Sequence, residues 1–458
     1  MSVVSEYEIS AELNRARLSR AQLVVLLLCF LVATFDGMDA QIIAFAAPWM
    51  MPDLGLANDQ LGIVFAAATV GMALGAALFG YLGDLYGRKR MVVLTVFMFA
   101  VCTPLAGLAN NLNELLIIRF VTGIGMGGAL PNAVTLVAEY SADRQRRMMV
   151  SVMYMGFAAG GIIGSVAAKV LIESYGWQSI FYFGGVLPLL LVPFLVRFMP
   201  ESMHYLVKRG DGSAQIAQQL SRINPTVSYP PQSRFTLAEA AANTRISLLF
   251  APDRLRNTIM LWIAFFINLL VLFFLMYWTP KLLIDYGMTA KQAFNVVLVF
   301  NIGGVGGGLL LAWMSEHMDP RVTLSGYFVV AMLSAMAVGL SVDHPTLLLL
   351  CAFVMGVTAG GAQVGLYPLA TQIYPTVIRV TGVSWAQSCG RVGSIIGPVA
   401  GGALVARGWG FTDSYLLFSS FLLIAAGAIF SMRLNAPKQQ SGLTQHGDSK
   451  SAVSNQVG

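Results

Sequence analysis

Four charged residues lie in the interior of long apolar segments, where ionised side chains are rare. They are Asp36, Asp39, Arg119 and Arg391. If these segments cross a membrane, each central charge costs about 2.5 to 3.5 kcal/mol, so such residues persist only when they are paired or useful. Asp36 and Asp39 stand three residues apart in the sequence Asp-Gly-Met-Asp, a spacing that places both carboxylates on one face of a helix.

Helix geometry gives the depth of these side chains in a bilayer. Asp39 lies about 12 Å and Arg119 about 9 Å from the outer end of its helix, so the two could form an ion pair, whereas Arg391 lies about 18 Å from the inner end, near the midplane. Arg391 is suited to hold an anionic substrate, bidentately if it is a carboxylate, while an aspartate binds and releases a proton. Alternatively, these residues are structural ion pairs that lock the fold. The sequence does not decide which aspartate titrates.

Membrane-spanning helices are the elements that must position these charges. Of the 458 residues, 57% are apolar and 11% are charged, whereas about a quarter are charged in soluble domains, so both a soluble and a disordered protein are excluded. Twelve apolar segments are long enough to cross about 30 Å of hydrocarbon as helices, and none alternates in polarity as barrel strands do. We therefore predict an all-α polytopic membrane protein. The expected spans are 21–47, 58–82, 90–109, 113–138, 147–172, 177–199, 254–280, 290–314, 321–341, 345–368, 376–405 and 412–432.

Basic residues predict the orientation of these spans. Placing the N-terminus in the cytoplasm puts most of the 28 Lys and Arg residues inside, which the positive-inside rule favours. Both termini are then cytoplasmic. These cations flank helices, so the net charge of +6 indicates contact with a lipid bilayer rather than with nucleic acid.

The chain divides into two similar halves. The polar stretch 200–253 separates six spans from six, and glycines recur in the two halves at the same offset, because 356 − 123 and 393 − 160 both equal 233. Such a repeat is typical of secondary transporters, whose substrate site lies near the midplane between the halves. The expected organisation is an N-terminal segment 1–20, a first half 21–199, a connecting cytoplasmic loop 200–253, a second half 254–433 and a disordered cytoplasmic tail 434–458.

The sequence contains no motif that we recognise as typical of an enzyme or of a metal site. The four cysteines lie in apolar spans without paired spacing, and the four histidines form no metal-ligand cluster. No Walker A motif occurs, and no nucleophile has a recognisable partner base. We expect a protein that is not an enzyme, binds no metal and needs no cofactor.

Several motifs resemble those of the major facilitator superfamily. Gly80–Lys89 resembles the loop motif G-x-x-x-D-R-x-G-R-R/K between helices two and three, with Leu85 in place of the first arginine, and Arg119–Gly127 is similar to the fourth-helix motif R-x-x-x-G-x-G-x-G. Within the superfamily, Asp36–Asp39 and Gly390–Gly393 resemble the D-G-x-D and eleventh-helix motifs of the aromatic acid:proton symporters.

This resemblance implies a function and a set of site residues. The family imports benzoate-like or hydroxybenzoate-like anions with protons across the bacterial inner membrane by alternating access, driven by the proton gradient and serving aromatic compound catabolism. An alternative is a proton-coupled carrier of another organic anion with the same fold, such as a dicarboxylate, a muconate-like acid or a sugar acid. We expect the chain to act as a monomer.

Roles follow for particular residues. The resemblance makes Asp36, Asp39, Arg119, Glu139 and Arg391 functionally required. Asp36, Asp39 and Glu139 are expected in proton coupling, and Asp84 with Arg88, Gly80 and Gly87 in a conformational gate. The residues expected to contact the substrate are Arg391, Arg119, Asp39, Gln363, Tyr367, Trp278 and Phe274.

Overall fold

Twelve long apolar helices dominate the computed structural model, which describes residues 6–433 except 211, 238–245, 253 and 376–377. Each is long and apolar enough to cross a membrane, which confirms the predicted polytopic helical fold within the described residues. The first six are α2 (Arg20–Leu54), α3 (Asn58–Tyr86), α4 (Arg88–Ala106), α5 (Leu112–Glu139), α6 (Asp143–Tyr175) and α7 (Gln178–Phe198). The second six are α10 (Leu255–Asp285), α11 (Ala290–His317), α12 (Pro320–Leu340), α13 (Pro345–Met355) continued by the π-helical turn η2 (Gly356–Gly360) and α14 (Gly361–Ile373), α15 (Arg379–Ala406), and α16 (Phe411–Phe430).

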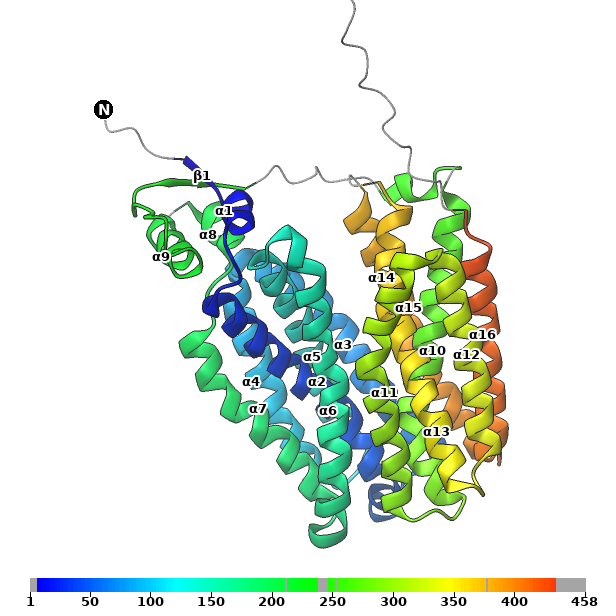
Figure 1. Cartoon of the computed structure of the whole chain (residues 1–458). Coiled ribbons are helices and arrows are strands. Elements are labelled where there is room, and N and C mark those ends of the chain that lie inside the picture. The colour runs from blue at the N-terminus through cyan, green and yellow to red at the C-terminus, as the bar shows by residue number, and fades with distance from the viewer. Residues whose placement is uncertain (1–5, 211, 238–245, 253, 376–377, 434–458) are drawn as a thin grey trace, which may run out of the picture.

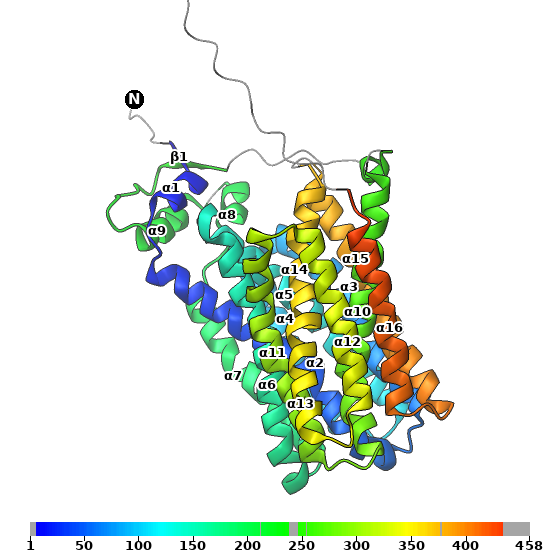
Figure 2. The same ribbon diagram turned by 45° about the vertical axis from the view of Figure 1, so that its right-hand side comes forward.

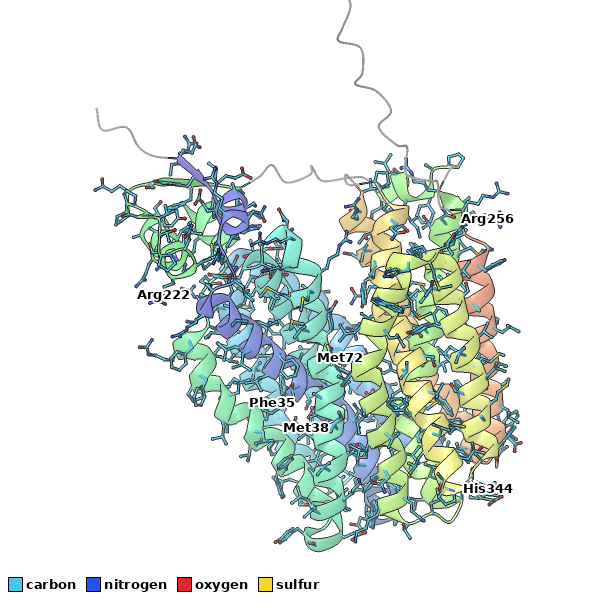
Figure 3. All side chains as sticks on the ribbon, viewed as in Figure 1. Phe35, Met38, Met72, Arg222, Arg256 and His344 are labelled. Carbon is cyan, nitrogen blue, oxygen red and sulfur yellow. The ribbon has the colours of Figure 1, made fainter. Side chains whose placement is uncertain are left out.

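The helices form two bundles, α2–α7 and α10–α16, which lie side by side (Figures 1 and 2). The start of α2 and the end of α16 lie at the same end of the molecule, together with α8 (Met203–Arg209) and α9 (Ser213–Ile223). We call this the α8–α9 end. Arg222 and Arg256 lie there, and His344 lies at the opposite end (Figure 3). The expected tail 434–458 falls outside the described residues.

Equivalent glycines make equivalent contacts in the two bundles. A Cβ on Gly160 of α6 would collide with the backbone of α2 at Thr34, and a Cβ on Gly393 of α15 would collide with the backbone of α10 at Phe266. Small residues at such positions allow helices in a membrane to approach closely. The offset that relates these glycines in the sequence therefore relates helix pairs in space, as expected for a duplicated six-helix unit.

A small polar unit, which the sequence did not predict, covers the α8–α9 end of the first bundle. Strand β1 (Glu6–Glu8), followed by α1 (Ile9–Arg15), pairs in parallel with β2 (Arg234–Thr236), which precedes the short helix η1 (Ile246–Phe250). The ring of Tyr7 contacts those of Tyr229 and Phe235. Residues 6–15 and the described part of the loop between the bundles thus fold together, through strands too short to give a detectable alternation of polarity.

The two bundles are joined near the end opposite to the α8–α9 end. Asn301 of α11 donates a hydrogen bond to Gln41 of α2 at 2.9 Å, and Gln41 donates back at 3.4 Å. Lys291 of α11 lies 3.1 Å from Glu173 of α6, and Phe65 of α3 stacks on Tyr277 of α10 with ring centroids 4.6 Å apart. The ribbons diverge from there toward the α8–α9 end (Figure 1).

Candidate functional site between the two helical bundles

Asp39 and Arg119 form a buried ion pair inside the first bundle. One guanidinium nitrogen of Arg119, on α5, lies 3.4 Å from the Asp39 carboxylate, and both side chains are 0% exposed. The Thr103 hydroxyl, on α4, donates to the other carboxylate oxygen at 2.5 Å. The ion pair between Asp39 and Arg119 that the depth estimate suggested is therefore present. Together with Thr103, it links the three helices α2, α4 and α5 of the first bundle.

Asp36 has very different surroundings, although it lies only one helical turn away on α2. It is 0% exposed, and within the described part of the chain neither of its carboxylate oxygens has a hydrogen-bond partner. Arg391 of α15, in the second bundle, is close enough to act on it electrostatically. An ionised carboxylate without hydrogen bonds is costly to bury, and the positive charge of Arg391 across the boundary offsets part of that cost.

Arg391, on α15 of the second bundle, is half-buried. No hydrogen bond or ion pair to its guanidinium is found among the residues that the structure describes. Three tyrosines interact with it electrostatically: Tyr154 of α6, Tyr277 of α10 and Tyr367 of α14. A half-buried arginine with free donors and tyrosines within electrostatic range is suited to bind a carboxylate attached to a ring.

Two of these tyrosines face each other across the boundary. The rings of Tyr154 and Tyr367 have centroids 6.3 Å apart and planes inclined by 19°. Gln363, one turn before Tyr367 on α14, lies 3.4 Å from its hydroxyl, and Asn268 of α10 donates to Gln363 at 2.6 Å. The predicted Gln363 and Tyr367 are therefore brought together near Arg391. Tyr154 and Asn268 were not predicted.

The sequence held a signal for one of these missed residues. Asn268 is a polar residue inside an apolar helix, so the reasoning that singled out the four charges applies to it as well. Tyr154 gives no such signal, because a single tyrosine at helical spacing more often packs against lipid or a neighbouring helix.

Phe274 and Trp278 do not join this group. Phe274 stacks on Phe418 of α16 with centroids 3.6 Å apart, inside the second bundle. The Trp278 indole donates to the backbone carbonyl of Pro398 at 3.0 Å and meets Phe65 edge to face, near the end where the bundles join. Both side chains are 0% exposed. Both residues pack within the protein instead. Most of α10 is apolar, so the sequence did not show which of its aromatic residues face the site.

Glu139 also lies apart from the central group. It ends α5 at the α8–α9 end, where it accepts a hydrogen bond from the Ser202 hydroxyl. Nδ1 of His204 lies 3.7 Å from Oε1 of Glu139. Burial, together with the charges of Lys208, Arg146 and Arg88, lowers the pKa of the His204 imidazole. The histidine is therefore neutral at neutral pH, so the carboxylate of Glu139 gains no full opposite charge from it.

The expected gate residues form one network at the α8–α9 end of the first bundle. Arg88 forms an ion pair with Asp84 at 2.5 Å and donates to the Gly80 carbonyl at 3.1 Å and to Asn132 of α5 at 3.0 Å. Between α3 and α4, Gly87 has φ = 104°, a conformation that side chains disfavour. The motif therefore builds the tight turn that joins these helices.

Within the described ranges, no group of three or more His, Cys, Asp or Glu residues is placed so that it could hold a metal ion.

Comparison with known proteins places the chain in a class. Residues 29–343 and 296–456 match the Major Facilitator Superfamily. The chain is 34% identical to the 4-hydroxybenzoate transporter PcaK of Acinetobacter baylyi, covering 93% of this chain and 94% of that protein. It is 34% identical to a gallate transporter of Pseudomonas putida, over 90% and 91% of the two chains, and 33% identical to the 3-(3-hydroxy-phenyl)propionate transporter of Escherichia coli, over 88% and 92%.

Solved structures show the same fold. A bacterial homologue of the human lysosomal transporter Spinster, in an inward-facing and occupied conformation, superimposes with a TM-score of 0.67 at 17% identity, covering 89% of this chain and 95% of that one. The chain is thus a multi-pass membrane transporter and not an enzyme. It belongs to the major facilitator superfamily, in the group of aromatic acid transporters.

Proposed function

We propose that this protein imports an aromatic carboxylate together with protons by alternating access. The observation that carries the proposal is the proximity of Arg391 and Asp36, two opposite charges that come from different bundles and act on each other electrostatically. Among the described residues, nothing occupies the donors of Arg391, and no hydrogen bond holds Asp36 in one protonation state.

Charge balance couples the two ligands. In the empty site, ionised Asp36 and Arg391 cancel. A substrate carboxylate that binds Arg391 neutralises its charge, and burial without hydrogen bonds then favours protonated Asp36, so the loaded site is neutral again. A site holding only the anion or only the proton carries one net charge in a low-dielectric environment, where that charge is costly. Only the empty and the doubly loaded forms therefore rearrange readily.

An aromatic substrate is favoured over an aliphatic acid by the tyrosines beside Arg391. Tyr154 and Tyr367 present two nearly parallel rings from opposite bundles, and aromatic rings bind one another by stacking and edge contacts. Relatives named for 4-hydroxybenzoate, gallate and hydroxyphenylpropionate transport agree with this choice. An aliphatic dicarboxylate has no ring to stack on such a pair of tyrosines.

The orientation follows from the basic residues. We propose that the α8–α9 end is cytoplasmic, that both termini lie inside, and that the protein resides in the bacterial inner membrane. The bundles are joined through Gln41 and Asn301 near the end that we propose to be the outer one, and they diverge from there, so we propose that this arrangement is an inward-facing state. The network of Asp84 and Arg88 then sits at the cytoplasmic gate. One chain contributes every residue of the site, and we expect a monomer to be sufficient.

Transport in reconstituted vesicles tests this proposal. With an acidic exterior, vesicles that contain the protein are expected to accumulate labelled 4-hydroxybenzoate well beyond protein-free vesicles, which control for passive entry of the neutral acid. A protonophore that collapses the gradient should remove the difference. Equal accumulation with and without the protein would refute the proposal.

A further inference from the structure

Asn268 carries an unused acceptor inside the proposed site. The residue is 1% exposed on α10. Its Nδ2 donates to Oε1 of Gln363 at 2.6 Å, but its Oδ1 is buried without a hydrogen-bond partner among the described residues. Buried acceptors are nearly always satisfied, so one that is left open beside a ligand-binding group indicates that the ligand supplies the donor.

Asn268, Gln363 and Tyr367 form a chain of hydrogen bonds in which each residue donates to the next. Asn268 donates to Gln363, and the Gln363 Nε2 donates to the hydroxyl of Tyr367 at 3.4 Å. Since the Tyr367 oxygen accepts from Gln363, its proton is free to be donated elsewhere. One end of this chain is the Tyr367 hydroxyl, which can donate a hydrogen bond near Arg391. The other end is Oδ1 of Asn268, an acceptor that has no donor among the described residues.

These two ends match two groups on one molecule. A carboxylate accepts hydrogen bonds and suits the end with Arg391 and Tyr367, whereas a ring hydroxyl can donate and suits Asn268. The ring between the two groups would lie against the facing tyrosines Tyr154 and Tyr367. An unsubstituted aromatic acid fills only the first end and leaves the Asn268 oxygen buried without a donor.

We propose that Asn268 accepts a hydrogen bond from a hydroxyl group on the substrate ring and thereby selects hydroxylated aromatic carboxylates over unsubstituted ones. This inference rests on the proposed function, because it assumes that the site binds an aromatic acid. Sites built to hydrogen-bond a substrate hydroxyl discriminate strongly against analogues that lack it. We expect a preference of about tenfold or more for the best hydroxybenzoate.

Competition for uptake tests the role of Asn268. Unlabelled benzoate, 3-hydroxybenzoate, 4-hydroxybenzoate and 4-methoxybenzoate compete with labelled substrate in vesicles containing the full chain. The methoxy acid keeps the size and oxygen of the hydroxy acid but has no proton to donate. Wild-type protein should prefer a hydroxy acid to both the methoxy and the unsubstituted acid. Equal competition by all four would overturn the inference without any variant.

Substitutions then assign the preference to one atom. Asn268→Leu should reduce the preference to about threefold or less, mainly by weakening the hydroxy acids, while Asn268→Gln, which keeps an amide with both donor and acceptor, should retain more of it. Asn301→Leu removes another buried amide and is expected to affect all four acids in parallel. An unchanged preference in Asn268→Leu would overturn the inference but leave the proposed function intact, whereas a wild-type protein that accumulates none of the acids would refute both.

Discussion

Two aspartates on one face of α2, a single helical turn apart, occupy opposite kinds of site. Asp39 is held by Arg119 and Thr103, all within the first bundle. Asp36 has no hydrogen bond among the described residues, and the positive charge that acts on it belongs to the second bundle. Contacts within a bundle survive when the bundles move as rigid bodies, whereas a charge across the boundary can change partners. We therefore propose that Asp39 is architectural and that Asp36 is the coupling residue, although the sequence had placed both in proton coupling and Asp39 also in substrate contact.

The largest effect is expected from removing the charge across the boundary. Arg391→Ala should abolish accumulation of substrate, with an affinity loss of at least about thirtyfold, because truncating one member of a buried charge pair costs about 2 to 5 kcal/mol. Arg391→Lys should bind better than Arg391→Ala but worse than wild type, since lysine keeps the charge and loses the bidentate geometry. Substrate binding to purified protein measures both.

Arg407, exposed at the end of the same helix, provides the matched control for that prediction. Arg407→Ala should bind substrate as wild type does. Near-normal binding in Arg391→Ala would place the anion elsewhere.

The architectural role of Asp39 predicts a loss of stability. Asp39→Asn leaves Arg119 buried without its counter-ion, a change that costs about 3 to 5 kcal/mol in buried pairs. The double variant Asp39→Asn with Arg119→Gln removes both charges and should recover much of the stability. The fraction of protein that stays monodisperse after heating in detergent measures this.

Asp36→Asn is the control on the same helix face. It breaks no hydrogen bond in the described structure, so its thermal stability should stay close to that of wild type. If Asp36→Asn and Asp39→Asn lost stability equally, the division between the two aspartates would fail.

A smaller effect is expected at the join between the bundles. Gln41 and Asn301 bond to each other in a buried contact, so a leucine at either position leaves the amide oxygen of the other without a donor, at a cost of about 1 to 3 kcal/mol. The single variants should shift the protein away from the inward-facing state, and the double variant should cost less than the sum of the two.

Distances between spin labels on the two bundles at the α8–α9 end report this shift as a larger population of short distances. Strictly additive effects of Gln41→Leu and Asn301→Leu would show that the two amides do not act as a pair.

Sequence patterns were sufficient for the features that depend on composition and depth. Long apolar runs specify the twelve helices, and distance along a helix paired Asp39 with Arg119. Sequence patterns were insufficient where the rotation of a helix about its axis decides which side chains line the site. Phe274 and Tyr367 are both aromatic residues at helical spacing, yet one packs on Phe418 within its bundle and the other faces Tyr154 across the boundary. Tertiary packing sets that rotation, and an evenly apolar helix carries no record of it.

Proton uptake upon substrate binding tests the central claim most directly. Sodium 4-hydroxybenzoate is added to purified protein in weakly buffered solution, and a pH indicator records the protons taken up. Wild-type protein should take up protons as substrate binds, and Asp36→Asn should bind substrate with one proton fewer. If Asp36→Asn took up as many protons per bound substrate as wild type, Asp36 would not be the residue that is protonated when the substrate carboxylate binds Arg391, and the central claim would be contradicted.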